Sequence, residues 1–108
     1  MKENKVYIQH MFDAVEKIER YSKDVGYEDF LIDTLRQDGI IRELEIIGEA
    51  AKKLSDDFKE NNASIPWRKV TGMRDKLIHD YFEVDAAAVW KTVKEDIPVF
   101  KRELLKFL

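Results

Sequence analysis

Residues 40–58 read IIRELEIIGEAAKKLSDDF, and their apolar side chains recur at every third or fourth position. This is the spacing of one face of an α-helix, whereas the side chains of a half-buried strand would alternate. The face consists of Ile40, Leu44, Ile47, Ala51, Leu54 and Phe58. A stripe of this length predicts a long amphipathic helix, whose apolar side must be buried against other helices.

The same spacing continues on both sides of this helix. A stripe over residues 7–25 predicts a first long helix, and Gly26 is expected to end it as a C-terminal cap. A short apolar segment follows at residues 30–35. Further stripes over residues 67–81 and 90–108 predict a fourth helix and a last one.

Polar residues and prolines mark the expected junctions. The stretch KENNAS (59–64) interrupts the pattern, Pro66 suits the first turn of the fourth helix, and Asp85 can cap the last helix. The last stripe stays in phase across Pro98, so we expect a kink there rather than a break. The sequence therefore predicts an all-α fold, an antiparallel bundle of four to five helices formed by a single domain of residues 1–108.

Composition narrows the class of function. The chain has 108 residues, no cysteine and two histidines, so cysteine chemistry is excluded and neither a metal site nor a cofactor is expected. Its longest apolar runs fall short of a membrane span and its N-terminus lacks a signal-peptide core, so we expect a cytoplasmic protein without a membrane partner. The net charge of −3 means that any nucleic-acid binding must be local.

The stretch GMRDKLIHDYF (72–82) places a positive charge where the predicted fourth helix should be apolar. At 100° per residue, Arg74 falls in the middle of the apolar arc and His79 falls beside it. An unpaired guanidinium in a core is prohibitive. Arg74 must therefore pair with a carboxylate such as Glu49 or Asp33, reach water along its stem, or line a cleft that binds phosphate.

Arginine, histidine and tyrosine, here Arg74, His79 and Tyr81, are side chains used in phosphodiester chemistry. Cleaving RNA without a metal requires removing a proton from the 2′-hydroxyl, stabilising charge on the phosphate oxygens and protonating the leaving oxygen. Imidazole, with a pKa of about 6.5, suits the two proton transfers, and a permanently charged guanidinium suits the stabilisation.

Two proton transfers require two groups, yet His79 is the only histidine in this stretch. The other histidine of the chain, His10, we interpret as a packing or surface residue. A two-fold dimer would supply the second group, because its interface duplicates every residue at the axis. Apolar positions outside the main stripes, such as Ile46 and Val15, are available for such an interface.

The pattern Arg74-x4-His79-x-Tyr81 resembles the signature of the HepT-like toxins, a branch of the HEPN superfamily of helical ribonucleases. Three blocks carry the resemblance in the same order: LEIIGEAAKKLS (44–55), IPWRKVTGMRDKLIHDYF (65–82) and VWKTVKEDIP (89–98). The resemblance implies a HEPN-like homodimer with metal-independent endoribonuclease activity. Arg74 would hold and stabilise the scissile phosphate, and His79 would serve as the acid or base.

The resemblance also implies supporting residues and a partner. Asp75 would orient its neighbours, or is a plain surface carboxylate. Glu49 would contribute an acid near the cleft, or forms an i,i+4 pair with Lys53. HepT-like toxins are typically made with an MNT-type nucleotidyltransferase antitoxin, which would transfer AMP to Tyr81 and block the cleft with bulk and charge. Tyr81 also lies on the apolar stripe, where it would pack with its hydroxyl at the rim, and the two roles are compatible.

The leading hypothesis is therefore an endoribonuclease toxin of a type II-like toxin–antitoxin pair, with RNA as its substrate. The alternative is a non-catalytic helical module that binds a nucleotide or RNA, or that only docks the antitoxin. In a third interpretation, Arg74 forms a core ion pair of no catalytic consequence, and its removal would orphan a buried carboxylate.

Overall fold

The computed structural model describes residues 2–73, 78–79 and 83–108. The helices are α1 (Lys2–Ser22), α2 (Tyr27–Ile32), α3 (Thr34–Lys53), α4 (Asp56–Asn61), α5 (Trp67–Thr71), α6 (Ala86–Lys91) and α7 (Ile97–Leu105). A π-helical turn, η1 (Thr92–Asp96), joins α6 to α7, and two short strands, β1 (Ile78–His79) and β2 (Glu83–Val84), lie between α5 and α6. The predicted all-α fold is confirmed.

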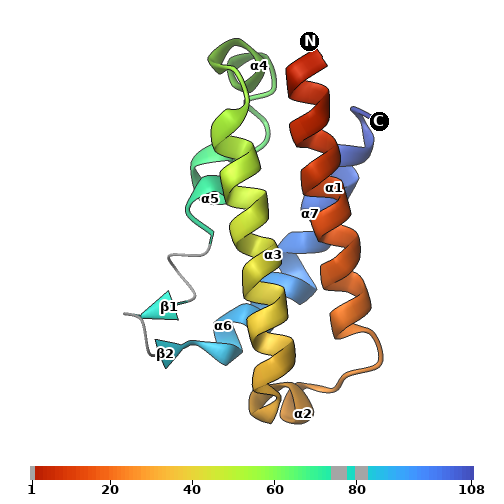
Figure 1. The fold of residues 1–108 in the computed structure, drawn as a ribbon, viewed down its shortest axis with the longest axis vertical. Helices are drawn as coiled ribbons and strands as arrows, with labels where there is room; N and C mark the ends of the chain where they lie inside the picture. Colours follow the sequence, from red (N-terminus) through yellow and green to blue (C-terminus); the bar gives the residue numbers. More distant parts are fainter. Residues whose placement is uncertain (1, 74–77, 80–82) are drawn as a thin grey trace.

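The two long helices form the frame of the molecule. α1 and α3 run antiparallel side by side, with α5 against α3 and with α7 and η1 against α1 (Figure 1). The core between them is closed, since Met11, Ile18, Ile40 and Leu44 are each 0% exposed. None of the described helices is long and apolar enough to cross a membrane.

The first helix ends earlier than the sequence predicts, and the expectation that Gly26 caps it is wrong. α1 ends at Ser22, whose hydroxyl donates to the carbonyl oxygen of Ile18 at 2.8 Å. Asp24 then takes the left-handed conformation with φ of 59°. Aspartate tolerates this region better than most residues. Gly26 instead precedes α2 as its N-cap.

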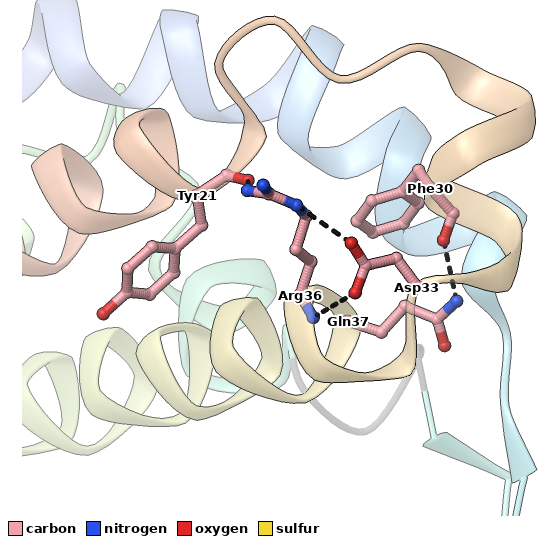
Figure 2. Close-up of polar contacts among 5 residues, drawn as sticks. All are labelled: Tyr21, Phe30, Asp33, Arg36 and Gln37. Carbon is pink, nitrogen blue, oxygen red and sulfur yellow. Dashed lines mark hydrogen bonds and ion pairs between the residues drawn. The ribbon is translucent and has the colours of Figure 1, made fainter.

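A polar cluster fixes the junction between α1, α2 and α3 (Figure 2). Asp33 caps α3 by accepting from the Arg36 backbone N–H at 3.1 Å, and its other oxygen pairs with Arg36 Nε at 2.9 Å. The Arg36 guanidinium also donates to the Tyr21 carbonyl at 2.6 Å, and the buried Gln37 amide donates to the Phe30 carbonyl at 2.8 Å. Asp33, one of the candidate partners for Arg74, thus has a structural role at this junction.

A second polar contact ties the start of α1 to the end of α3. The chain turns at Leu54, and Ser55 begins α4 by accepting from the Phe58 backbone N–H at 3.2 Å. The buried Asn4 side chain donates to the Ser55 hydroxyl at 3.2 Å and accepts from the Ser55 backbone N–H at 3.1 Å. The polar stretch after residue 58 is therefore partly helical, contrary to the sequence prediction, because Ser55 starts a new helix.

Asn4→Ala is expected to lower the free energy of unfolding by about 1–3 kcal/mol, because it leaves the half-buried Ser55 N–H without its acceptor. Gln9→Ala is the matched control: the Gln9 amide bonds to Asp13 on the exposed side of the same helix. That variant should change stability by less than about 0.5 kcal/mol. Urea denaturation of both variants measures the difference, and equal stabilities would contradict the assigned role of Asn4.

The last helix follows the prediction. The Asp85 side chain caps α6 by accepting from the Ala88 N–H at 3.0 Å. The helical path continues through Pro98, which lies in the first turn of α7, where a missing N–H costs little. The helical path is irregular just before Pro98, at the η1 turn, where the Ile97 N–H donates to the Thr92 carbonyl.

The predicted fourth helix over residues 67–81 is confirmed at its start, Trp67–Thr71, and is wrong at residues 72–73 and 78–79. α5 ends at Thr71, and the Gly72 N–H closes it by bonding to the Arg68 carbonyl at 3.1 Å. Glycine disfavours continuation of a helix because its backbone has more conformations to lose. Further along, Ile78 and His79 form a strand that pairs antiparallel with β2. The helical-wheel positions predicted for Arg74 and Tyr81 fall outside the described residues.

Candidate functional site

The residues predicted to carry the chemistry are only partly described. Arg74, Asp75 and Tyr81 lie outside the described residues. His79 lies in β1, where it is the register partner of Glu83 in β2. The site can therefore be built from the elements that hold the two ends of the segment containing Arg74 and His79. We call residues 72–82 the catalytic segment, after the role that the sequence predicts for these two residues.

A direct backbone contact holds the start of the catalytic segment. The buried Gly48 of α3 faces the end of α5 so closely that a Cβ at this position would lie 3.0 Å from the Thr71 carbonyl oxygen and 3.6 Å from that of Val70. Glycine inside a helix costs about 0.5–1 kcal/mol relative to alanine, so its presence here is explained by this approach. α3 thus fixes the point from which the segment departs.

Gly48→Ala is expected to destabilise the protein by about 0.5–2 kcal/mol, because overpacking against a backbone atom exceeds the gain in helix propensity. Gly39→Ala is the matched control in the same helix, since a Cβ there would meet only the Tyr21 ring at an ordinary 3.5 Å. Gly39→Ala should be neutral or stabilising by up to about 1 kcal/mol. Thermal and urea unfolding measure both, and a Gly48→Ala variant as stable as Gly39→Ala would rule out the tight contact.

The other end of the catalytic segment runs into a capped and packed helix. β2 is followed by the N-cap Asp85, and α6 carries Trp90, whose ring centroid lies 5.3 Å from that of Phe30 and 5.7 Å from that of Tyr27 in α2. Aromatic pairs at these separations stabilise beyond their buried area. The segment is thus bracketed by α3 at its start and by α2 at its exit.

Glu49, predicted as a supporting acid, lies on α3 next to Gly48. Its carboxylate pairs with Lys52 at 3.3 Å, so the i,i+4 partner considered for it, Lys53, is not the one that the structure shows. The Glu49 side chain is 69% exposed, and an ion pair this exposed contributes little to stability. Its carboxylate is therefore held loosely and is accessible to a ligand.

Glu49 and His10 line the same groove, which has a volume of about 330 Å³ and lies between α1 and α3. We call it the α1/α3 groove, and it is lined by Tyr7, His10, Arg42, Glu45, Ile46, Glu49, Ala50 and Lys53. His10 is exposed, in agreement with its interpretation as a surface residue, and its ring forms a T-shaped pair with the Tyr7 ring at a centroid distance of 6.1 Å.

The two apolar residues proposed for a dimer interface differ in exposure. Val15 is 0% exposed and belongs to the core, so its expected availability is wrong: it packs inward from α1. Ile46 is partly buried and lines the α1/α3 groove. The sequence did not indicate this groove, although Arg42, Glu49 and Lys53 recur at helical spacing and could have marked one polar face.

Comparison with known proteins gives a consistent result. A family model described as "Ribonuclease HepT-like" matches residues 11–107. The "Probable ribonuclease HepT" of Thermococcus cleftensis is 50% identical over 103 residues, which cover 95% of this chain and 94% of that protein. A "Putative RNase" of Caldanaerobacter subterraneus is 37% identical over 108 residues, covering 100% of this chain and 96% of that protein.

A longer protein also matches. The "Gamma-glutamylcyclotransferase and putative RNase" of Methanocaldococcus jannaschii is 45% identical over 107 residues, which cover 99% of this chain but 48% of that protein. No solved structure matches the chain. Since the family model spans all three sequence blocks and nearly the whole bundle, the chain belongs to the ribonuclease HepT-like family.

Proposed function

We propose that the chain is a metal-independent endoribonuclease toxin, which acts as a homodimer with Arg74 and His79 of both subunits lining one cleft. The observation that carries the proposal is the pattern Arg74-x4-His79-x-Tyr81 in a chain of a ribonuclease family. The described structure supports it by bracketing this segment between two packed helices. A dimer supplies the second imidazole that a monomer lacks.

The proposed reaction is an internal transfer of the phosphodiester bond. One His79 removes the proton from the ribose 2′-hydroxyl, whose oxygen attacks the adjacent phosphorus. Arg74 stabilises the charge that develops on the non-bridging oxygens. The other His79 donates a proton to the 5′ oxygen as the phosphorus–oxygen bond breaks. The products are a 2′,3′-cyclic phosphate and a 5′-hydroxyl.

Two carboxylates would support this reaction. Asp75 would orient its neighbours in the catalytic segment. Glu49 would act at the edge of the cleft, and the exposed carboxylate observed on α3 is compatible with that role.

The direct test is incubation of purified protein with single-stranded RNA in EDTA. We expect cleavage, and we expect the upstream fragments to end in a cyclic phosphate. RNA that is bound but remains intact would contradict the proposal and favour the alternative of a binding module. Chelation excludes a metal-dependent contaminant, because such a nuclease would lose its activity.

The partner in this proposal is an MNT-type nucleotidyltransferase antitoxin, which transfers AMP from ATP to the Tyr81 hydroxyl and releases pyrophosphate. AMP adds bulk and negative charge beside the site for the RNA phosphate, so cleavage should cease. Incubation with such an enzyme and ATP should add one AMP to the parent chain by mass spectrometry. Tyr81→Phe lacks the acceptor oxygen and should remain both unmodified and active. AMP on another residue would refute the assignment.

A further inference from the structure

The α1/α3 groove combines aromatic, cationic and acidic side chains. α1 supplies the Tyr7 and His10 rings, and α3 supplies Arg42, Glu49 and Lys53, which recur at i, i+7 and i+11 and so share one face. Its volume of about 330 Å³ lies at the small end of ligand sites. That size suits a single nucleotide and is too small for a double helix.

Each kind of side chain in the groove matches a different part of a nucleotide. Aromatic rings stack on unpaired bases whatever their sequence. Arginine and lysine bind phosphate oxygens. A carboxylate accepts hydrogen bonds from the exocyclic amino groups of bases. The Tyr7 ring, the Arg42 and Lys53 cations and the exposed Glu49 carboxylate meet all three requirements.

A second pocket differs from the α1/α3 groove in its balance of charge. It lies between α5 and α7, has a volume of about 210 Å³ and is lined mainly by apolar side chains. Among its charged residues, Asp96 and Glu103 outnumber the single cation Lys69. A nucleotide phosphate would be repelled there, whereas in the α1/α3 groove two cations match two carboxylates.

The α1/α3 groove also adjoins the start of the catalytic segment. Glu49 lines the groove, while its neighbour Gly48 contacts the Thr71 carbonyl, one residue before that segment begins. One turn of α3 therefore lines the groove through Glu49 and contacts the end of α5 through Gly48. The α1/α3 pair runs along the long axis of the molecule (Figure 1). An RNA strand that follows the groove would run along this axis.

We propose that the α1/α3 groove binds one unpaired nucleotide of the RNA substrate beside the bond that is cut. Tyr7 stacks on the base, Arg42 and Lys53 bind its flanking phosphates, and Glu49 accepts from the base and favours bases that carry an amino group. This inference rests on the proposed function, because RNA must be the substrate. The site would set affinity and base preference, leaving the chemical step to Arg74 and His79.

Binding to a fluorescent single-stranded RNA oligonucleotide, measured in a His79→Ala background, tests the inference without turnover. Tyr7→Ala should weaken binding about tenfold, whereas Tyr7→Phe keeps the ring and should bind normally. Lys53→Gln should weaken binding and reduce the slope of log K against log salt by about 0.7. Lys106→Gln is the control, because it removes the same charge at a position just beyond α7. It should change neither the affinity for RNA nor the salt dependence of binding.

The outcomes separate this inference from the proposed function. If the parent cuts RNA while Lys53→Gln and Tyr7→Ala bind and cut as it does, the subsite is refuted and the nuclease proposal stands. If the parent binds RNA without cutting it and the groove variants lose that binding, the nuclease proposal is refuted and the groove remains a binding site for RNA. Because Tyr7 packs partly against the core, Lys53→Gln, at an exposed position, decides the matter if Tyr7→Ala unfolds. A changed oligomeric state in Lys53→Gln would overturn the subsite.

Discussion

RNA cleavage by the His79→Ala variant is expected to be about 10²–10⁴-fold slower than by the parent, the usual contribution of a general acid or base. In the proposed dimer this substitution removes both proton-transfer groups at once. His79 is also part of the two-residue β1–β2 pairing. That pairing uses backbone atoms, which alanine retains, so the variant should stay folded.

The measurement is a single-turnover rate at saturating RNA, with thermal unfolding as a check on the fold. His10→Ala is the control, because it removes the other histidine of the chain from the α1/α3 groove. That variant should alter the RNA concentration needed for saturation and leave the saturated rate unchanged. A His79→Ala variant that cuts at the parental rate would refute the mechanism.

Arg74→Ala is expected to slow cleavage by about 10²–10³-fold, the effect of losing one preorganised donor to a developing charge. Arg74→Lys keeps the charge but loses the fork that binds two phosphate oxygens, so its rate should fall between those of the parent and the alanine variant. Urea unfolding distinguishes this role from a core ion pair. Loss of a buried partner would cost about 3–5 kcal/mol, whereas loss of a cleft residue should cost far less.

Mixing parent subunits with His79→Ala subunits tests whether the cleft is shared. A heterodimer of the two retains both guanidinium groups but only one imidazole, so in a shared cleft one of the two proton transfers loses its group and the heterodimer should cut RNA far more slowly than half the parental rate. Exchange is confirmed by differently tagged subunits. If tagged heterodimers cut at half the parental rate, each subunit works alone and the proposed composite site is incorrect.

The sequence predicted the helical class well, because a helix that buries one whole face repeats its apolar residues at helical spacing. Such buried faces are present in α1, in α3 and along the path from α6 to α7. It failed where local chemistry overrides periodicity. The apolar phase of residues 67–81 suggests one helix, but Gly72 closes α5 and Ile78–His79 pairs with β2. The end of α1 was missed because Asp24, rather than the glycine, adopts the left-handed turn.

The candidate site could be predicted only where its residues are neighbours along the chain. The pattern from Arg74 to Tyr81 is local, so its family was identified, and the family comparison confirms it. The Asn4–Ser55 contact joins residues 51 positions apart. The α1/α3 groove likewise combines His10 with Glu49. Such pairs depend on the antiparallel register of two helices, which no single stretch of sequence encodes.

The approach of Gly48 to Thr71 restricts how this enzyme can change by mutation. Every replacement for glycine adds a Cβ, which would have to fit 3.0 Å from a backbone oxygen. A descendant with a larger residue at this position must therefore acquire a compensating shift of the following helix. Because that shift would also move the catalytic segment, the position should change rarely in active lineages and more freely in those that have lost RNA cleavage.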